Sequence, residues 1–368
     1  MTYYLIAGEA SGDLHGANLM KALKNEDPHA KFRFLGGDLM QEQGGHLVRH
    51  YSDMAYMGFI EVLLNLRKIL KNLRHTKEDL LANKPDALIL IDSPGFNLKI
   101  AQFARKNNIK VFYYISPKVW AWNQKRVLKI QKVVDKMFCI LPFEVDFYKS
   151  WGMTVDYVGN PLLDAIADFV PNPRFRLKHA LGEKPIVALL PGSRTQEVNR
   201  ILPDMFSVLD NFPNYQFVIA GAPGFDEEFY RKITGDKRLP IVYNQTYDLL
   251  KNSEAAIVTS GTATLETALF DIPQVVVYKG SPISIGIARL LVKIKYISLV
   301  NLIMDKEVVK ELIQEDCNSK SLSEELNAIL HDPLNRSQML INYQQLAERM
   351  GEPGASKKTA RLIIKNLI

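Results

Sequence analysis

The chain has 368 residues, of which 47% are hydrophobic and 23% charged, and its net charge is +6. At roughly 100–200 residues per domain, this length predicts two domains, and the balance of apolar and charged residues excludes a disordered or collagen-like chain. The two cysteines, Cys139 and Cys317, are too few for a disulfide framework or a tetrahedral zinc site, which favours a reducing compartment.

Short apolar runs bounded by Gly, Pro or charged residues recur along the chain, and such runs are typical of strands buried on both faces of a parallel sheet. In chain order they are 3–7, 87–91, 111–115, 137–141, 186–190, 217–220, 256–259 and 275–278. Segments with helical periodicity lie between them, as at 14–23, 98–106 and 198–209. Alternating strands and helices predict βαβ units and a doubly wound α/β fold.

The strand, small-residue turn and helix at the N-terminus start again at Pro185, after a polar, Pro-bearing stretch at 171–184 that indicates a linker and a short helix. We therefore predict two Rossmann-like domains, residues 1–170 and 171–353. A terminal helix at 354–368 packs on one of them, the first being a candidate. Ligands of such folds bind outside the carboxyl ends of the strands, so a cleft between facing domains and the loops that follow strands are the places to look for a site.

Two loops of the first half carry candidate residues. Gly8–Asp13 leads into a helix whose free N–H groups suit an anion or a close ligand, although a tight turn capped by Asp13 explains it equally well. Asp92 ends an apolar strand, where desolvation would raise its pKa and make it a better base. The alternative is that Asp92 caps the helix that begins near Pro94.

The segment 116–126 combines two tryptophans with several cations directly after a strand, which suits a phosphorylated, partly apolar ligand. Packing between domains by the two tryptophans is the alternative. In the second half, Arg194 precedes a helix and would clamp a diphosphate, unless it only pairs with Glu197 on the surface. A second anion cradle, 260–266, places Glu266 in the first helical turn, where it would accept from ribose hydroxyls or complement the helix dipole.

Several motifs are missing from the sequence: a P-loop, the dinucleotide-binding G-x-G-x-x-G at the first loop, a zinc-protease helix and a G-x-S-x-G elbow. We expect no metal and no cofactor. Two amphipathic stretches, 58–74 and 283–300, combine Lys and Arg with wide apolar faces, which suits a membrane surface or an acyl chain. For either stretch alone, an ordinary core helix with a charged outer face is the simpler reading.

Taken together, these segments resemble one family, the lipid-A-disaccharide synthases, which are bacterial glycosyltransferases of lipid A assembly. The matching segments keep their order over nearly the whole chain: AGEASGDLHGA (7–17), FLGGDLM with a following GG (34–45), YMGFIEVL (56–63), IDSPGFN (91–97), ISPKVWAWNQKRV (115–127), LPFE (141–144), YVGNPLLD (157–164), LLPGSRTQEV (189–198), SGTATLETAL (260–269), IARLLVKIKYISLVNLI (287–303), ELIQEDC (311–317) and GASKKTARLI (354–363). One position departs from the family pattern, Asn160, where we expect His.

The resemblance implies a GT-B-like fold and transfer of 2,3-diacylglucosamine from its UDP derivative to 2,3-diacylglucosamine 1-phosphate (lipid X), with inversion and without metal. It implies that Asp92 is the base and that Arg194 faces the UDP phosphates with Ser260, Gly261 and Thr262. The remaining implied positions are grouped by ligand: for the ribose, Glu266; for the nucleotide, Asn301, Gln314 and Glu315; for the acceptor, Glu9, Ser11, Gly12 and Asp13; for sugar or acceptor phosphate, Trp120, Trp122, Lys125 and Arg126.

The expected location is the cytoplasmic side of the inner membrane, with peripheral association through 58–74 and 283–300 and with no nucleic-acid partner. The N-terminus does not resemble a signal peptide, and no run approaches the ~18 apolar residues of a spanning helix. A homo-oligomer stays open. The alternatives are another GT-B enzyme, such as a UDP-N-acetylglucosamine 2-epimerase, or a non-enzymatic, membrane-associated nucleotide-binding module.

Overall fold

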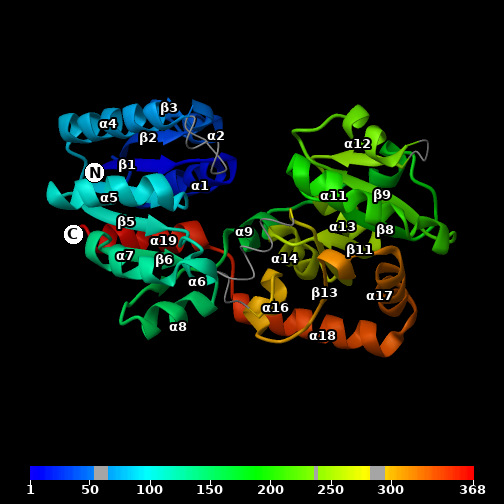
Figure 1. Ribbon diagram of the computed structural model, residues 1–368. Helices are drawn as coiled ribbons and strands as arrows, with labels where there is room; N and C mark the ends of the chain where they lie inside the picture. Colours follow the sequence, from blue (N-terminus) through cyan, green and yellow to red (C-terminus); the bar gives the residue numbers. More distant parts are fainter. Residues whose placement is uncertain (54–64, 236–238, 282–294) are drawn as a thin grey trace. The chain divides into compact units, whose positions relative to one another are not determined.

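The computed structural model describes residues 1–53, 65–235, 239–281 and 295–368. Contacts within the chain separate two units (Figure 1). The first unit consists of Met1–Ala167 together with Glu352–Ile368, and the second is Asp168–Gly351. No helix among the described residues is long and apolar enough to cross a membrane.

The first unit is built on a seven-stranded parallel sheet with the strand order β3-β2-β1-β4-β5-β6-β7. Apart from the seventh strand, this is the 3-2-1-4-5-6 order of a Rossmann fold. The strands are β1 (Thr2–Ala7), β2 (Lys31–Gly36), β3 (His46–His50), β4 (Ala87–Ile91), β5 (Lys110–Tyr114), β6 (Lys136–Cys139) and β7 (Asp156–Tyr157).

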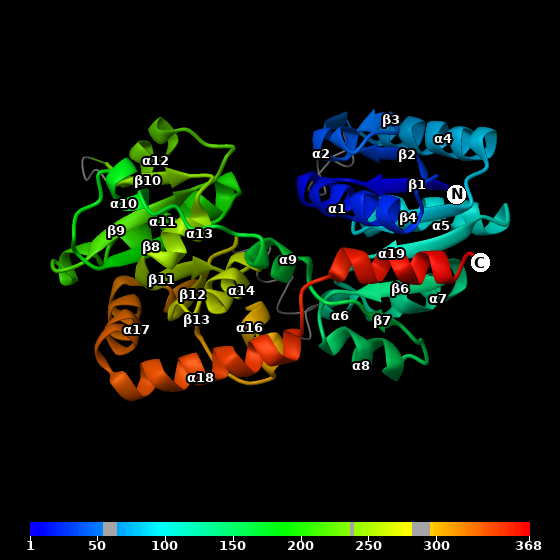
Figure 2. The same ribbon diagram turned by 180° about the vertical axis from the view of Figure 1, so that it is seen from behind.

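Helices cover both faces of this sheet (Figures 1 and 2). They are α1 (Ala10–Glu26), α2 (Asp38–Glu42), α4 (Leu66–Asn83), α5 (Pro94–Lys106), α6 (Val119–Trp122), α7 (Val127–Val133), α8 (Phe143–Ser150), α9 (Pro161–Ala167) and α19 (Ala355–Lys365), with 3-10 turns η1 (Tyr51–Asp53) and η2 (Gln124–Arg126). Because side chains alternate along a strand, Tyr3 and Leu5 of β1 enter one core and Tyr4 and Ile6 the other.

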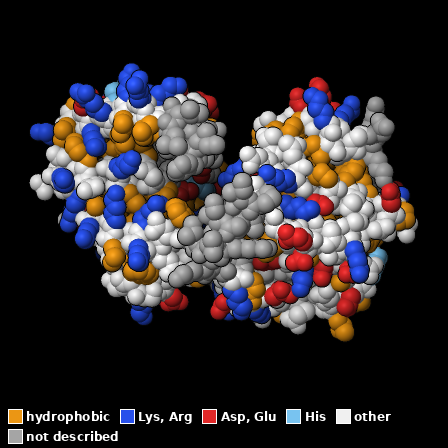
Figure 3. All heavy atoms as spheres, in the orientation of Figure 1, with side chains coloured by type: hydrophobic (Ala, Val, Ile, Leu, Met, Phe, Trp, Pro, Cys, Tyr) orange, Lys and Arg blue, Asp and Glu red, His pale blue; other side chains and the backbone are white. Residues whose placement is uncertain are grey.

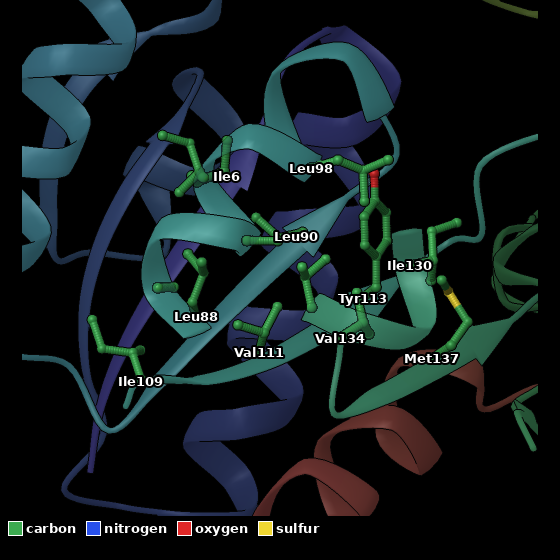
Figure 4. Close-up of a cluster of buried hydrophobic side chains, with 14 of the residues drawn as sticks. Ile6, Leu88, Leu90, Leu98, Ile109, Val111, Tyr113, Ile130, Val134 and Met137 are labelled. Carbon is green, nitrogen blue, oxygen red and sulfur yellow. The ribbon is translucent and has the colours of Figure 1, made fainter. Parts of the chain in front are cut away.

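One of these two cores lies between the sheet and α4, α5 and α7 (Figure 4). Leu88 and Leu90 of β4 and Val111 and Tyr113 of β5 point into it, and Ile130 of α7 reaches them from the helical side. The apolar runs that predicted strands are thus buried on both faces, as a parallel sheet requires.

The C-terminal helix α19 packs beside α1 on the other face of the first sheet (Figure 2). Ala360 and Ile363 enter the core that contains Tyr3 and Leu5. At its exposed edge, the Arg361 side chain pairs with Glu26 of α1 at 2.8 Å. The end of the chain is therefore an integral layer of the first unit.

The second unit repeats the arrangement with a six-stranded parallel sheet of order β10-β9-β8-β11-β12-β13. Its strands are β8 (Ile186–Leu190), β9 (Gln216–Gly221), β10 (Ile241–Tyr243), β11 (Ser253–Thr259), β12 (Gln274–Tyr278) and β13 (Lys310–Ile313). Its helices are α10 (Phe175–Lys178), α11 (Thr195–Phe206), α12 (Glu227–Thr234), α13 (Thr246–Lys251), α14 (Thr262–Leu269), α16 (Leu299–Met304), α17 (Ser319–His331) and α18 (Pro333–Met350), with 3-10 turns η3 (Leu209–Asn211) and η4 (Gln314–Asp316).

Each apolar run singled out in the sequence lies on a strand, so the predicted doubly wound α/β class is confirmed. The sequence did not predict five strands: β2, β3, β7, β10 and β13. Four of them are the outer strands of the two sheets, where one side of the strand needs no apolar neighbour. The fifth, β2, alternates charged and apolar residues as KFRFLG and so lacks a continuous apolar run.

Candidate functional site

In both sheets the strand order reverses beside the first strand of the unit, because β1 lies between β2 and β4 and β8 lies between β9 and β11. In open α/β sheets, ligands bind outside the carboxyl ends of the strands at such a switch point. The loops that flank it are 8–13 and 92–97 in the first unit and 191–195 and 260–262 in the second. Four of the five segments singled out in the sequence therefore lie at the two switch points.

In the first unit the two flanking loops touch. A Cβ atom built on Gly8 would stand 2.5 Å from Oγ of Ser93, so only glycine permits this approach. Glu9 occupies the N-cap position of α1, and its Oε1 accepts a hydrogen bond from the Ser11 hydroxyl at 2.7 Å. Next to this pair, burial lowers the pKa of His15 to about 4, so the imidazole is neutral at pH 7.

Asp92 is held in a strained backbone conformation. Both Asp92 and Ser93 adopt the left-handed region, with φ of 45° and 43°, and neither is glycine. Two buried side chains fix the turn: the Tyr113 hydroxyl and the Asn97 amide, the latter at 2.8 Å, both donate to the carbonyl oxygen of Asp92. Strain of this kind costs of order 1–3 kcal/mol per residue and persists only where surrounding contacts impose it, which is common at active sites.

The Asp92 carboxyl has an unusual electrostatic setting. Burial raises its pKa, the nearby Glu9 carboxylate raises it further, and the Lys118 ammonium opposes both. The N-cap of α5 is Ser93, so Asp92 does not occupy the capping position that the alternative assigned to it. A desolvated carboxylate with a raised pKa at a switch point is suited to accept a proton.

The Asp13 side chain forms hydrogen bonds within the first unit. Its carboxylate accepts three backbone N–H groups at the start of α2, from Gly37, Leu39 and Met40, at 2.6, 3.1 and 3.2 Å. Asp13 therefore caps α2 and not the helix on which it lies. Gly12 is also enclosed, because a Cβ there would meet the Ala7 side chain at 3.2 Å. The predicted contact of Asp13 and Gly12 with an acceptor stays a prediction, whereas Glu9 and Ser11 lie nearer the surface of the loop.

The segment after β5 divides into a buried and an exposed half. Trp120 is buried, its ring meets Phe143 edge-on at 4.9 Å, and its Nε1 donates to Glu144 at 3.2 Å. Trp122 is 51% exposed, and the Arg126 guanidinium lies 5.0 Å above its ring. Lys125 is exposed as well. The structure thus leaves Trp122, Lys125 and Arg126 accessible to a ligand, while Trp120 belongs to the interior.

In the second unit the switch point is open and basic. Arg194 is the N-cap residue of α11, its side chain is 70% exposed, and it pairs with Glu197 at 2.8 Å. The surface pair considered in the sequence is therefore formed. Exposed pairs are worth at most about 1 kcal/mol, so an anion could take the place of Glu197 at little cost.

The second anion cradle lies across the switch point from Arg194. Ser260 donates its hydroxyl to the carbonyl of Ile297 at 2.8 Å, which ties the loop to the chain before α16. Gly261 is the N-cap of α14, and a Cβ atom there would meet no atom within 4 Å, so its surroundings are open space. Thr262 is exposed beside it. These small residues leave the N-terminus of α14 accessible, as an anion site requires.

Glu266 lies deeper than the sequence indicated. The helix α14 begins at Thr262 and has no acidic residue in its first turn, so the prediction that Glu266 lies in that turn is wrong: Glu266 is the fifth residue of the helix, just beyond the first turn. Burial raises the pKa of Glu266, and the Tyr247 hydroxyl donates to its Oε1 at 3.0 Å. Complementing the helix dipole is therefore not its role, and a contact with ribose stays a prediction.

Two of the three positions expected near the nucleotide line one hollow. A cavity of about 390 Å³ is bordered by Arg200, Lys279, Gly280, Gln314 and Glu315. Gln314 has φ of 55°, and its Oε1 accepts from the Gly280 amide at 2.6 Å. The third, Asn301, is fully buried with its amide bonded to Val308, Val309 and Glu311, which makes it a brace inside this unit.

Asn160, the departure from the family pattern, has a structural use. Its Oδ1 accepts from the Leu162 amide at 3.0 Å at the start of α9, and its Nδ2 donates to the Ile140 carbonyl at 3.1 Å. The side chain thus joins the turn after β6 to the start of α9, both within the first unit. Among the described residues, no group of three or more His, Cys, Asp or Glu side chains is placed to hold a metal ion.

The amphipathic stretch 58–74 is described only from residue 65 onward. There α4 exposes Leu66 and Leu70, 46% and 54%, beside the exposed Arg67, Lys68 and Lys71. Leu73, an apolar residue of the same stretch, is buried in the core. Figure 3 shows basic and hydrophobic side chains mixed over the region of α4. Of the second stretch, 283–300, residues 283–294 lie outside the described residues.

Sequence reasoning missed three buried polar residues that surround the candidate base or its neighbours: Asn97, Tyr113 and Glu144. The signal was partly visible, because Asn97 ends the IDSPGFN segment and Glu144 ends the LPFE segment. It also missed Arg200 and Lys279, which line the hollow beside Gln314. Nothing local distinguishes these two cations from others on the surface.

Comparisons with known proteins agree with this geometry. The model of the family described as "Lipid-A-disaccharide synthetase" matches residues 3–364. The chain is 40% identical over 364 residues to the lipid-A-disaccharide synthase of Syntrophus aciditrophicus, covering 97% of this chain and 95% of that protein. It is 37% identical to that of Myxococcus xanthus, covering 99% and 97% of the two chains.

Solved structures resemble the fold at much lower identity. The UDP-GlcNAc 2-epimerase of Neisseria meningitidis bound to UDP-GlcNAc matches with a TM-score of 0.70 at 12% identity, covering 100% of both chains. The calicheamicin glycosyltransferase CalG4 matches with a TM-score of 0.62 at 14% identity, covering 100% of this chain and 98% of that one. The predicted GT-B-like class is confirmed, and at these identities the likeness concerns the fold alone.

Proposed function

Because the chain belongs to the lipid-A-disaccharide synthetase family and is a glycosyltransferase of lipid A biosynthesis, we propose that it joins two acylated glucosamines. The donor is UDP-2,3-diacylglucosamine and the acceptor is 2,3-diacylglucosamine 1-phosphate. The products are the β-1,6-linked disaccharide 1-phosphate and UDP. The observation that carries this proposal is the pair of switch points, one with a desolvated carboxylate and one with an exposed arginine between two helix N-termini.

In the proposed reaction, Asp92 accepts the proton of the acceptor 6-hydroxyl while that oxygen attacks the anomeric carbon of the donor. The bond from this carbon to the diphosphate oxygen breaks on the opposite side, which converts an α-linked donor into a β-linked product. Burial supports this role for Asp92, because a raised pKa makes its carboxylate a stronger base than an exposed one. Glu9 and Ser11 would orient the acceptor from the neighbouring loop.

Charge that develops on the leaving diphosphate requires compensation. We assign this to Arg194 and to the free N–H groups at the starts of α11 and α14, which point their positive dipole ends toward the edge of the second sheet. Ser260, Gly261 and Thr262 would shape the cradle, and Glu266 would accept from the ribose hydroxyls. The proposed scheme assigns no metal ion and no cofactor, since guanidinium and helix N-termini supply the positive charge.

The decisive experiment is incubation of the purified protein with both lipid substrates, followed by mass spectrometry of the lipid product and measurement of UDP. A disaccharide phosphate that appears in equal amount to UDP is the expected result. Release of UDP without a disaccharide would contradict the transfer. Conversion of UDP-N-acetylglucosamine into its C2 epimer, without any acceptor, would establish the epimerase alternative instead.

We also propose that α4 contacts a membrane surface, where both substrates reside. Leu66 and Leu70 would enter the interface while the neighbouring cations meet anionic headgroups. Cosedimentation with phosphatidylglycerol vesicles tests this. The double variant Leu66→Ser/Leu70→Ser should bind about 30-fold more weakly, since partial burial of each leucine contributes about 1 kcal/mol. Leu334→Ser, at an exposed leucine of the second unit, should bind unchanged; equal binding by all three proteins contradicts the proposal.

A further inference from the structure

A buried carboxylate in the first unit takes no part in the reaction as proposed. Glu144, the second residue of α8, is 1% exposed. Its Oε1 accepts from Nε1 of Trp120 at 3.2 Å, and its Oε2 accepts from the backbone amides of Ile140 and Leu141 at 3.3 and 3.0 Å. Every neighbour in this set is a donor, so the ionised form satisfies the contacts even though burial raises the pKa of Glu144 to about 7.

A second side chain of α8 reaches the same loop. The Tyr148 hydroxyl lies 2.7 Å from the hydroxyl of Ser116, and both residues are buried. The helix α8 therefore holds the loop after β5 at two points, Ser116 and Trp120. These two residues are two positions before and two positions after Lys118. The loop also begins with a strained residue, Ile115, with φ of 65°, which for a β-branched side chain needs support from its surroundings.

Lys118 lies between these two fixed points of the loop. It lies four residues after Tyr114, the last residue of β5, whose carbonyl oxygen accepts from the Asp92 amide at 3.4 Å. The Lys118 side chain is exposed, and its ammonium lowers the pKa of the Asp92 carboxyl. Two further groups act on the Asp92 carboxyl: the Glu9 carboxylate raises its pKa, and a hydrogen bond from the Ser93 backbone amide lowers it. The buried Tyr113 hydroxyl is bonded to the Asp92 carbonyl. Among the described residues that act on Asp92, Lys118 is the only cation that lowers its pKa.

We propose that Glu144 is a positioning residue which, together with Tyr148, clamps the loop 115–122 so that Lys118 is held beside Asp92. The consequence for catalysis rests on the role of Asp92 proposed above, whereas the clamp itself does not. A glutamine at position 144 has the same shape but turns an amide N–H₂ toward two backbone N–H groups or toward Trp120, so it cannot satisfy all three donors.

The first measurement follows the burial of Trp120 in the loop and does not depend on activity. In a background with Trp122→Phe and Trp151→Phe, Trp120 is the remaining tryptophan, and its quenching by acrylamide reports its burial. Glu144→Gln should increase the quenching constant, and Tyr148→Phe, which loses one hydroxyl, should increase it less. Asp135→Asn is the matched control, because Asp135 accepts from the Val111 amide at 2.8 Å at the amino end of the same strand β5; it should leave quenching unchanged.

The second measurement reads Lys118 through Asp92. For Glu144→Gln we expect kcat to fall by about 10²-fold with little change in KM for the donor, since a displacement of about 1 Å near the reacting groups costs that much. The acid limb of the kcat/KM profile should move to higher pH, because Asp92 loses a nearby cation. Lys118→Gln should move it in the same direction, and the double variant should add little to either single change.

The outcomes separate the two proposals. Unchanged Trp120 quenching in both Glu144→Gln and Tyr148→Phe overturns the clamp. Increased quenching with effects that add fully to those of Lys118→Gln overturns the link to Lys118. If Asp92→Asn keeps normal turnover while Trp120 quenching rises in Glu144→Gln, the role of Asp92 as base is wrong but the clamp holds. Should Glu144→Gln fail to fold, Tyr148→Phe decides alone.

Discussion

In the first unit, the loops at the switch point bring together two carboxylates and a strained left-handed turn, and buried hydroxyl and amide groups hold them in place. The Lys118 cation acts on Asp92 from the loop after β5. In the second unit, the corresponding loops carry small residues, two helix N-termini and an exposed arginine that pairs with Glu197. The strand order around the two switch points is the same. The same topology therefore marks the place in both units, and local side chains and backbone conformation distinguish the proposed site of proton transfer from the proposed anion site.

The sharpest test of this difference is Asp92→Asn. Asparagine keeps the size of the side chain but cannot accept a proton, so kcat for UDP release should fall by about 10²–10⁴-fold. The melting temperature should change little. Asp27→Asn, at a carboxylate bonded to the N-terminal amine near the opposite edge of the sheet, should keep its turnover. Near-normal turnover of Asp92→Asn would show that Asp92 is not the base and that the two switch points do not differ as proposed.

Next in size is the effect of Arg194→Ala on the second unit. Hydrogen bonds to a charged partner contribute about 1.5–3 kcal/mol, so the affinity for UDP should fall by about 10- to 100-fold. Titration calorimetry with UDP measures it. Arg231→Ala is the control, because Arg231 is also an exposed arginine paired with a glutamate on its own helix, Glu227. If both variants bind UDP like the wild type, Arg194 is merely half of a surface pair.

A smaller loss is expected from Gly261→Val. The residue has extended backbone geometry with φ of 162° and open space where a side chain would stand. Folding should therefore tolerate valine, while the new methyl groups should obstruct an anion at the start of α14. UDP affinity should fall by roughly tenfold, or about 1.4 kcal/mol. Gly182→Val is the control, because Gly182 precedes the amino end of β8 and a Cβ atom there would meet no atom closer than 4.0 Å; this variant should bind UDP normally.

The smallest predicted effect concerns pH. The Glu9 carboxylate raises the pKa of Asp92, so Glu9→Gln should lower that pKa. Asp92 must be ionised to act as a base, and activity rises as the pH passes its pKa. The acid limb of the kcat/KM profile should therefore shift to lower pH by less than about one unit. At a pH on that limb, a shift of one unit changes kcat/KM by about tenfold. A shift to higher pH would show that Glu9 does not act on Asp92 through its charge.

How much of this was visible in the sequence differs between the two switch points. In the second unit, the sequence placed Gly261 and Arg194 directly before helices, and both occupy N-cap positions in the structure. Their contact with an anion stays a prediction. In the first unit, the position of Asp92 at the end of an apolar strand was visible, but the supports of Asp92 were not. Tyr113 resembles any other apolar strand residue in sequence, and only the neighbouring strand shows where its hydroxyl ends.

For Asp13 and Asn301, the sequence did not show which partners the folded chain supplies. Both are polar residues in segments that resemble a functional family, yet their side chains are bonded to backbone groups within their own units. A buried polar group must find partners, and a one-dimensional pattern cannot distinguish partners in the protein from partners in a ligand. Glu266 failed differently, because its helix begins at Thr262 and a helix boundary shifts every residue's position relative to the dipole.

Local sequence predicted the eight strands that carry continuous apolar runs and the loops that end them, because such runs bounded by Gly, Pro and charge are typical of strands buried on both faces of a parallel sheet. It also determined the chemical types available there: an aspartate in one half, an arginine and small residues in the other. What the folded chain decided is which groups meet. Burial and the distances between segments far apart in the chain exist only once the sheets are packed. They determine the raised pKa of Asp92, the effect of Lys118 on it and the hydrogen bond between Trp120 and Glu144.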